Sequence, residues 1–520
     1  MSYKKKTVLA LAAFAALRII YLLYTPFDLS PDEAHYWEWS RRLDFSYYSK
    51  GPGVAYVIAF FTGIFGDTAF GVRAGAVVFS TLASYVIFLL GRDLFKCEKT
   101  GFFSAILANI VPIFSIGAIL MTTDVLLVFF WGATLLCVKR ALDGKGGWWW
   151  HMAGVFAGLG FLSKYTIALL YPCILLFLLA SGKERVWLKR AGPYIGAIIG
   201  VALSSPVIYW NIMHGQVTIK HTLGQAHAGA GGVSFLEPLE FLASQFGIIT
   251  PIVFIGFIYG IYLCALYGFR RKDDGALLAF FASAPVFLLF FFKGFHGKVQ
   301  ANWAIAAFIT AMPASVWAFR LLYGESKASG KKVLIVYLPM FRLLLSSLLR
   351  VAAISGAVLS VIVSLLAYFP QALETMGAES IFSRPPYNRV MGWKELGEKV
   401  SRVKEDMDRA GRTFIMSDTY QITGELAFYT EGRPVTYNAD TGSRRMNQYD
   451  LWPGFDGLYG YNAVYVKGGD AEIDAVVLHA FDRCGREPFT VYGKGRELKE
   501  VTIFRCYNFK GMEKKGLSRF

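Results

Sequence analysis

The strongest constraint on this chain is a series of long apolar runs along its first 370 residues. Of its 520 residues, 55% are hydrophobic and only 17% are charged. Soluble domains carry about a quarter charged residues, and a membrane-spanning helix needs about 20 apolar residues. The runs therefore predict a polytopic α-helical membrane protein with about 11–13 transmembrane helices. Eleven spans are predicted, at 7–24, 70–90, 101–117, 122–138, 148–162, 165–181, 192–211, 241–266, 276–292, 300–319 and 350–369.

Basic residues occupy every second connection between these runs. They are Lys4, Lys5, Lys6, Arg92, Lys96, Lys99, Lys139, Arg140, Lys145, Lys183, Arg185, Lys189, Arg190, Arg270, Arg271, Lys272, Arg320, Lys331 and Lys332. Connections rich in Lys and Arg stay on the cytoplasmic side. The pattern predicts a cytoplasmic N-terminus without a cleaved signal peptide. Orientation and lipid headgroups account for the net charge of +16 better than a nucleic acid partner does.

Three segments complicate the count of spans. Residues 52–66 are apolar but short, and we expect a helix lying in the membrane interface. Residues 148–181 have basic loops at both ends, so we expect a hairpin with its tip at residues 163–165. Residues 333–349 are interrupted by a proline and an arginine, and we do not expect them to cross.

An acidic pair follows the first run, in the stretch Ser-Pro-Asp-Glu-Ala-His-Tyr-Trp-Glu-Trp at 30–39. Carboxylates such as Asp32 and Glu33 are costly where a membrane helix reaches the interface. One interpretation is local, with Ser30 as helix cap, Pro31 in first position and the acids in the first turn. The other is chemical, because such carboxylates can act as a general base for a hydroxyl or can bind a cation.

Further polar residues gather on the predicted outer side, at the ends of the spans. They are His35, Lys50, Arg73, Asp124, Lys164, Asn211, His214, Lys220, His221, His227, Gln245, Lys293, His296, Lys298 and Asn302. Outer loops are normally poor in Lys and Arg. Cations beside carboxylates suit an anionic lipid phosphate with a hydroxyl nucleophile nearby.

Simpler roles stay open for several of these residues. Lys164 and Lys293 could extend to the interface without binding a substrate. Asp124 could cap the helix that follows Thr122-Thr123. The three histidines between 214 and 227 resemble metal ligands, but their spacing fits no compact site, so no metal is assigned.

Short stretches in a fixed order carry a family resemblance. They are D-E-A-H-Y-W-E-W at 32–39, Y-Y-S-K-G-P-G at 47–53, F-G-V-R at 70–73, T-T-D at 122–124, G-L-G-F-L-S-K-Y-T at 158–166, W-N-I-M-H-G at 210–215, S-Q-F-G at 244–247 and N-W at 302–303, with D-T-Y-Q-I-T-G-E-L-A-F-Y at 418–429 further on. The series resembles the bacterial branch of the protein-O-mannosyltransferase-like family, whose members are GT-C glycosyltransferases related to the lipid A aminoarabinose and galacturonic acid transferases. Many relatives carry a His-Pro-Pro type turn where this chain has residues 49–53, so Lys50 is expected to contact the substrate differently.

The resemblance implies an inverting transferase in the bacterial inner membrane, with a polyprenyl-phosphate-linked sugar as donor and a lipid or glycan hydroxyl as acceptor. The first acid of the loop is the usual base in that family, so Asp32 takes the hydroxyl proton and Glu33 orients acceptor or sugar. Binding of the donor falls to His35, Lys50, Arg73, Asp124, Lys164, Tyr165, Lys293, His296, Lys298 and Asn302. Binding of the acceptor falls to His214, His221, Gln245 and Tyr420. No cofactor is required on this interpretation, and a divalent cation is the alternative.

The composition changes after Pro370. Residues 1–370 are predicted as the transmembrane catalytic domain, with a first outer loop at 26–70, and residues 371–520 as an α/β domain in the periplasm. The expected elements are an amphipathic helix at Gly392–Ala410 and strands at Thr413–Met416, Val435–Asn438, Ala463–Val466 and Val501–Cys506. Cys484 and Cys506 could form a disulfide in an oxidising compartment.

Two other classes of function compete with a lipid A transferase. A flippase or transporter also places charged residues in membrane cavities, although no internal repeat is visible. An enzyme with a longer glycan donor, or one that glycosylates protein, would show the same motifs.

Overall fold

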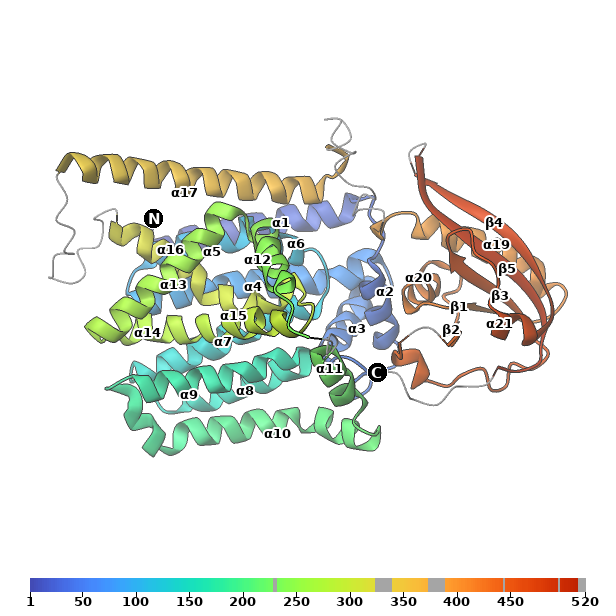
Figure 1. Ribbon diagram of the computed structural model, residues 1–520, viewed down its shortest axis with the longest axis horizontal. Helices are drawn as coiled ribbons and strands as arrows, with labels where there is room; N and C mark the ends of the chain where they lie inside the picture. The colour runs from blue at the N-terminus through green and yellow to red at the C-terminus, as the bar shows by residue number, and fades with distance from the viewer. Residues whose placement is uncertain (228–231, 323–338, 373–388, 443–444, 494–495, 513–520) are drawn as a thin grey trace. The chain divides into compact units, whose positions relative to one another are not determined.

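The computed structural model describes residues 1–227, 232–322, 339–372, 389–442, 445–493 and 496–512 (Figure 1). The chain forms two compact units. Unit 1 consists of Met1–Tyr21, Ala74–Tyr209 and Gln225–Ala372, and unit 2 of Leu22–Arg73, Trp210–Gly224 and Leu373–Phe520. Unit 2 thus combines the whole predicted outer loop 26–70 with the C-terminal residues, while the division of the sequence at residue 370 remains a prediction.

Unit 1 is built from helices, and its long helices run side by side (Figure 1). They are α1 (Tyr3–Tyr24), α4 (Ala69–Phe95), α5 (Glu98–Ile110), α6 (Pro112–Gly117), α7 (Thr123–Leu142), α8 (Trp148–Ser163), η1 (Tyr165–Leu169), α9 (Leu170–Ala180), η2 (Glu184–Lys189), α10 (Ala191–Met213), α12 (Leu236–Ile249), α13 (Pro251–Arg271), α14 (Asp274–Phe281), α15 (Ala284–Lys293), η3 (Gly294–His296), η4 (Ala301–Ala307), α16 (Phe308–Leu322) and α17 (Pro339–Tyr368). The unit boundary falls inside α1, α4 and α10.

Eight helical segments in the described residues are long and apolar enough to cross a membrane. They are Tyr3–Tyr24, Ala69–Phe95, Thr123–Leu142, Ala191–Met213, Pro251–Arg271, Asp274–His296, Ala301–Leu322 and Ser347–Tyr368. The chain is therefore a polytopic α-helical membrane protein. The remaining three predicted spans, 101–117, 148–162 and 165–181, are divided or shorter than 18 residues.

Proline accounts for two of the places where a predicted span is broken. The span predicted at 101–117 divides at Val111, before Pro112, and the span at 241–266 divides at Thr250, before Pro251. The α region is disfavoured for a residue before proline, and Val111 is extended, with φ −69° and ψ 128°. Thr250 leaves the α region with a φ of 79°. Apolar composition alone does not reveal such a break.

The described helices bear on each of the three difficult segments. Residues 148–181 turn at Lys164, which lies between α8 and η1. Residues 52–66 contain the short apolar helix α3 (Gly53–Phe65), whose expected place in the membrane interface remains a prediction. Of residues 333–349, the part from Pro339 onward opens α17, and 333–338 lie outside the described residues.

Glycines allow α8 and α10 to approach closely. A Cβ atom added to Gly154 would lie 2.0 Å from the carbonyl oxygen of Gly196, and one added to Gly158 would lie 2.7 Å from Cβ of Leu203. Small residues four positions apart on one helix face permit such contact between membrane helices.

Unit 2 combines helices with a five-stranded sheet. Its elements are α2 (Pro31–Ser40), α3, α11 (Val217–His227, which ends in unit 1), α19 (Trp393–Asp408), β1 (Thr413–Ser417), α20 (Tyr420–Tyr429), β2 (Thr436–Asn438), η7 (Gln448–Asp450), β3 (Asn462–Gly468), α21 (Ala475–His479), β4 (Phe481–Gly493) and β5 (Arg496–Phe509). The strand order is β2-β1-β3-β5-β4, with β1 parallel to β2 and β3, and β5 antiparallel to β3 and β4 (Figure 1).

Alternating side chains give the sheet two buried faces. Ile415, Val464 and Ile503 pack with residues of α19 and α20 on one face. Phe414 and Tyr465 lie on the other face, in a cluster that includes residues of α21. The C-terminal residues therefore form the α/β domain that the sequence predicted.

The predicted helix and all four predicted strands of this domain are confirmed, but β4 and α20 were not predicted. Strand β4 contains Gly485, Pro488 and four charged residues, which hide its strand pattern. It is an edge strand, where proline is tolerated. A disulfide joins Cys484 and Cys506, which lie opposite each other on β4 and β5.

We predict that Gly154→Ala destabilises the packing of α8 on α10, because a new methyl group would overlap a backbone oxygen that cannot move away easily. The expected loss is about 1–3 kcal/mol, visible as a lower melting temperature in detergent. Gly256→Ala in α13 is the matched control, since a Cβ there meets nothing within 4 Å. Equal melting temperatures for the two variants would refute the close approach.

Candidate active site

Helix α2 begins as the sequence predicted. The Oγ of Ser30 accepts a hydrogen bond from the backbone nitrogen of Glu33 at 3.4 Å, and Oε2 of Glu33 accepts one from the backbone nitrogen of Ser30 at 3.0 Å. Pro31 occupies the first position. This reciprocal capping fixes the start of the helix and the orientation of the residues that follow.

Glu33 forms a buried ion pair with Arg73, in the first turns of α4. Nε and Nη2 of Arg73 donate to the two carboxylate oxygens at 3.0 and 2.9 Å. Nη1 and Nη2 also donate to the carbonyl oxygens of Phe27 at 3.2 Å and Asp28 at 2.7 Å. Every side-chain nitrogen of Arg73 thus has an oxygen partner, as a buried guanidinium requires. The Glu33–Arg73 pair connects the segment before α2 to the beginning of α4.

Asp32, by contrast, has an exposed side chain. Its Oδ1 accepts a hydrogen bond from the hydroxyl of Tyr420 at 3.3 Å. Helix α20, which carries Tyr420, lies close to α2, because a Cβ added to Gly424 would come within 3.2 Å of the backbone nitrogen of His35. Of the two adjacent acids, Glu33 is buried in an ion pair with Arg73 and Asp32 faces solvent.

His35 and Glu38 lie on the buried part of α2. Nε2 of His35 accepts a hydrogen bond from Nε1 of Trp39 at 3.2 Å, and burial lowers the pKa of His35 to about 3, so its ring is neutral. Glu38 accepts a hydrogen bond from the hydroxyl of Tyr449, and burial raises the pKa of Glu38 to about 7. Sequence analysis missed Glu38, although its place between two tryptophans indicated a buried acid.

A second set of buried ionisable groups was also missed. Glu425 of α20 is fully buried, and within the described residues neither carboxylate oxygen has a hydrogen-bond partner. Burial raises its pKa well above the ordinary value. Asp28 accepts a hydrogen bond from the backbone nitrogen of Trp393 at 2.8 Å, and the ammonium of Lys499 lies 3.2 Å from the centre of the Trp393 ring. Burial lowers the pKa of Lys499 to about 7.

Lys50 lies in a cationic part of unit 2. The charges of Lys50 and Arg445 add to burial in lowering the pKa of His221 to about 4. The ring of His221 lies 4.8 Å from that of Tyr48, and the ring of His214 stacks on Trp210 at 4.0 Å. The chain around these side chains is mostly helical, since α10 continues to Met213 and α11 begins at Val217.

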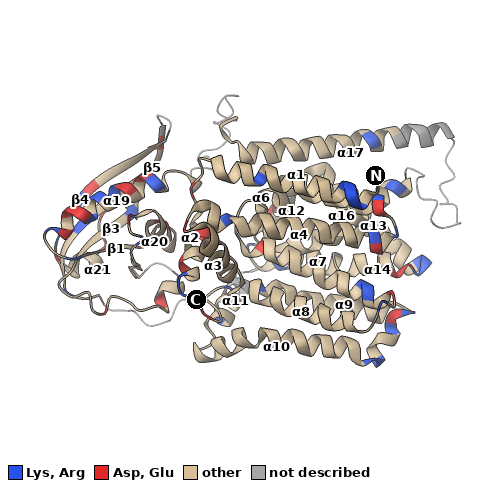
Figure 2. Cartoon of the chain, turned by 180° about the vertical axis from the view of Figure 1, so that it is seen from behind, with Lys and Arg blue, Asp and Glu red and all other residues tan. Residues whose placement is uncertain are grey.

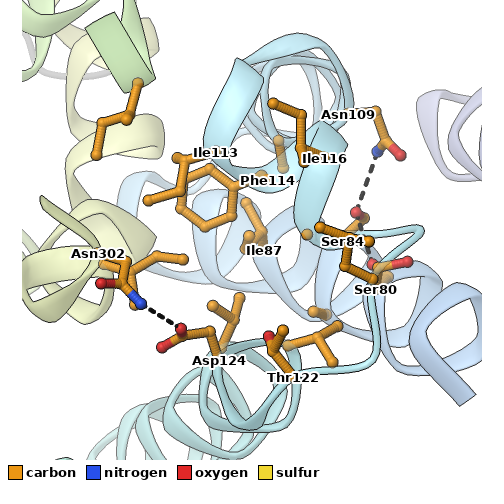
Figure 3. Close-up of a pocket in the computed structure, with 18 of the residues that line it drawn as sticks. Ser80, Ser84, Ile87, Asn109, Ile113, Phe114, Ile116, Thr122, Asp124 and Asn302 are labelled. Carbon is orange, nitrogen blue, oxygen red and sulfur yellow. Dashed lines mark hydrogen bonds between the residues drawn. The ribbon is translucent and has the colours of Figure 1, made fainter. Parts of the chain in front are cut away.

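Asp124, Lys164 and Asn302 form a polar group in unit 1. The ammonium of Lys164 donates to Oδ1 of Asp124. Nδ2 of Asn302 donates to Oδ2 of Asp124 at 2.7 Å (Figure 3). Asp124 lies in the first turn of α7 but makes no capping hydrogen bond there. The sequence placed all three on its candidate list, yet only the fold reveals that they meet.

A cavity of about 340 Å³ opens beside this group. Its wall is mostly apolar, with Ile87 and Phe114 among the lining residues (Figure 3). Asn109 donates to Oγ of Ser84 at 3.0 Å and accepts from Nη1 of the buried Arg18 at 2.7 Å. The volume lies within the range of small-molecule sites. A hydrocarbon group with a polar end fits this lining.

The remaining predicted residues of unit 1 do not share that polar group. Nε2 of Gln245 donates to the carbonyl oxygens of Phe241 at 3.1 Å and Ala301 at 3.3 Å, which fixes the backbone. Lys293 lies 5.4 Å from the centre of the Trp303 ring. His296 and Lys298 are exposed in the turn after it, and the ring of Tyr165 packs against Phe161.

The described residues contain no group of three His, Cys, Asp or Glu arranged to hold a metal ion. The side chain of His227 lies outside the described residues.

The buried Glu38 predicts a pH dependence of stability. Its pKa is about 7 in the fold and 4.5 ordinarily, so the folded protein keeps a proton that the unfolded chain releases between these pH values. This contribution to stability is present below pH 4.5 and lost as the pH rises through 7. The melting temperature should fall between pH 5 and pH 8 relative to that of Glu38→Gln, which mimics the protonated acid. Glu398→Gln, at an exposed position, is the control, and parallel profiles for wild type and Glu38→Gln would contradict the assignment.

Comparison with known proteins places these features in a family context. Residues 49–210 match the family model of dolichyl-phosphate-mannose-protein mannosyltransferases. A lipid A galacturonosyltransferase, RgtD, of Rhizobium johnstonii is 26% identical over 424 residues, which cover 81% of this chain and 82% of that protein. An undecaprenyl phosphate-α-4-amino-4-deoxy-L-arabinose arabinosyl transferase of Pseudomonas savastanoi is 26% identical over 37% of this chain and 39% of its own length.

Solved structures share the fold. ArnT from Cupriavidus metallidurans bound to undecaprenyl phosphate has a TM-score of 0.62 at 16% identity, over 96% of this chain and 97% of that chain. The archaeal oligosaccharyltransferase AglB from Archaeoglobus fulgidus has a TM-score of 0.54 at 14% identity, over 89% of this chain and 70% of that chain. In sequence and in fold this chain is therefore similar to membrane glycosyltransferases, among them the lipid A galacturonosyltransferase and the aminoarabinose transferases.

Proposed function

We propose that this enzyme transfers a sugar from a polyprenyl-phosphate donor to a hydroxyl group of lipid A or of the attached core glycan, with inversion at C1. The donor class is supported by the arabinosyl transferase relative, whose name specifies undecaprenyl phosphate. The acceptor is supported by the galacturonosyltransferase relative, which acts on lipid A and matches most of this chain.

The observation that carries the proposal is the contrast between Asp32 and Glu33. Only Asp32 is exposed, on a helix start that the capping box and the Glu33–Arg73 pair hold in place. A general base must be accessible to the hydroxyl and ionised near neutral pH. We assign Asp32 as the base and Tyr420 as the residue that orients its carboxylate.

Glu33 and Arg73 then act as positioning residues, because each is already satisfied by the other. This revises the roles that the resemblance implied, orientation of a substrate for Glu33 and phosphate binding for Arg73. The negative charge that develops on the leaving phosphate is stabilised by cations that can reach the substrate. Lys50 is half-buried beside Arg445 and His221, and we assign it to the donor phosphate.

In unit 1 we assign the cavity beside Asp124 to the polyprenyl part of the donor. Its apolar wall offers the remote contacts that contribute binding energy to a transferase. Lys164 and Asn302 hold Asp124 in one orientation at the polar end. We propose no required cofactor, with a divalent cation as the alternative that assays with and without added Mg²⁺ or a chelator distinguish.

Replacement of Asp32 tests the proposal directly. Asp32→Asn keeps the size of the side chain but cannot accept the hydroxyl proton, so transfer to lipid A should fall by at least about 100-fold. Purified protein, a polyprenyl-phosphate sugar and lipid A are the assay components, with the product identified by mass spectrometry. Asp456→Asn, at another exposed acid of unit 2, should leave transfer unchanged. An Asp32→Asn enzyme with near-normal turnover and melting temperature would exclude Asp32 as the base.

Orientation in the membrane forms the second part of the proposal. The basic connections support a cytoplasmic N-terminus and a periplasmic position for residues 371–520 in a bacterial inner membrane. The Cys484–Cys506 disulfide supports an oxidising compartment for that domain. A reporter that is active only in the periplasm should therefore work when fused after Phe520. Activity of a cytoplasm-specific reporter at the same position would reverse the assignment.

A further inference from the structure

A second cavity, of about 460 Å³, lies in unit 1 at the opposite end of α7. Asp124 is in the first turn of that helix, whereas Lys139, which lines the second cavity, is in its last turn. At 1.5 Å per residue the two are separated by about 22 Å along the helix. The second cavity is therefore distinct from the one assigned to the donor.

The last turns of several helices meet around this cavity, together with the start of α14. Charged residues gather at this end of unit 1 (Figure 2). Five cations and four acids line the cavity: Lys96, Lys139, Lys183, Arg271 and Lys272, with Asp143, Glu184, Asp273 and Asp274. The cations exceed the acids by one, and the acids are largely engaged by other groups.

Each acid has a partner within the protein. Asp143 pairs with Lys139 at 2.5 Å and with Lys96 at 3.3 Å. Glu184 pairs with Lys183 at 2.7 Å. In the other two cases the partners are not cations: Asp273 accepts from the backbone nitrogen of Ala276 at 3.0 Å, and Asp274 accepts from Oγ of Ser181 at 2.6 Å.

Arg271 and Lys272 are left as the cations that can accept an outside anion. In the described parts of the chain neither forms an ion pair, and both are exposed. The guanidinium of Arg271 lies 4.9 Å from the ring centre of Tyr267, which also lines the cavity. Adjacent apolar lining comes from Leu94, Phe95, Leu142, Trp317 and Leu321.

We propose that this cavity binds the phosphate group of an anionic ligand, with Arg271 and Lys272 as the principal contacts. A guanidinium can bind phosphate through two hydrogen bonds, and an adjacent ammonium adds a point charge. Basic pockets between membrane helices commonly hold anionic lipid headgroups. The neighbouring apolar side chains make a phospholipid the expected source of the phosphate, with a free phosphate ion as the other source.

Binding to the full-length purified protein tests this site. Delipidated protein in detergent is mixed with phosphatidylglycerol, with phosphatidylcholine or with inorganic phosphate, and bound ligand and melting temperature are measured by native mass spectrometry and thermal unfolding. We expect retention of phosphatidylglycerol to be at least about tenfold weaker in the double variant Arg271→Gln, Lys272→Gln. The double variant Lys189→Gln, Arg270→Gln removes the same charge from residues that do not line the cavity and should bind as the wild type does.

The probes distinguish the two sources of phosphate. If the cavity variant alone retains less phosphatidylglycerol, the ligand is a lipid. If the cavity variant alone binds less inorganic phosphate, and phosphatidylglycerol retention is unchanged, the ligand is a free phosphate ion. Equal binding by all three proteins, or an equal loss in both double variants, would overturn the site. Sugar transfer by the cavity variant shows that it is folded, and the single variant Lys272→Gln repeats the test if the double variant does not fold.

Discussion

The ion pair between Glu33 and Arg73 is the interaction on which the arrangement of unit 2 depends. A carboxylate and a guanidinium that are both buried are stable only when each satisfies the other, and removal of one partner typically costs about 3–5 kcal/mol. The same guanidinium binds two carbonyl oxygens of the segment before α2. The capping box uses the same carboxylate, so one side chain fixes the helix start and the approach of the chain to it.

Because the start of α2 is held in place, residues of this helix have opposite environments. Asp32 reaches solvent, while His35 and Glu38 point into a core that includes Tyr449. Burial keeps His35 neutral and shifts the pKa of Glu38 to about 7. Burial, and not the residue type alone, therefore sets the protonation states of His35 and Glu38.

Unit 1 separates its polar groups along its helices. The Asp124 group adjoins a mostly apolar cavity, whereas the cavity at the other end of α7 is lined by opposite charges. Charged groups are stable near a membrane only when they pair or reach water, which explains why they collect at helix ends. Two such ends on one helix keep the Asp124 group and the charged cavity apart within unit 1.

The sequence by itself determined the class of protein, the helix start at Ser30 and most elements of the C-terminal domain, because these depend on local patterns of apolar, capping and strand-forming residues. It also supplied Asp32, Asp124, Lys164 and Asn302 as candidates. Only the tertiary structure decided that Glu33 forms an ion pair with Arg73 and that Glu38 is buried. It also decided that Asp124 contacts Lys164 and Asn302. Those outcomes depend on contacts between residues 40 to 411 positions apart, which no local pattern encodes.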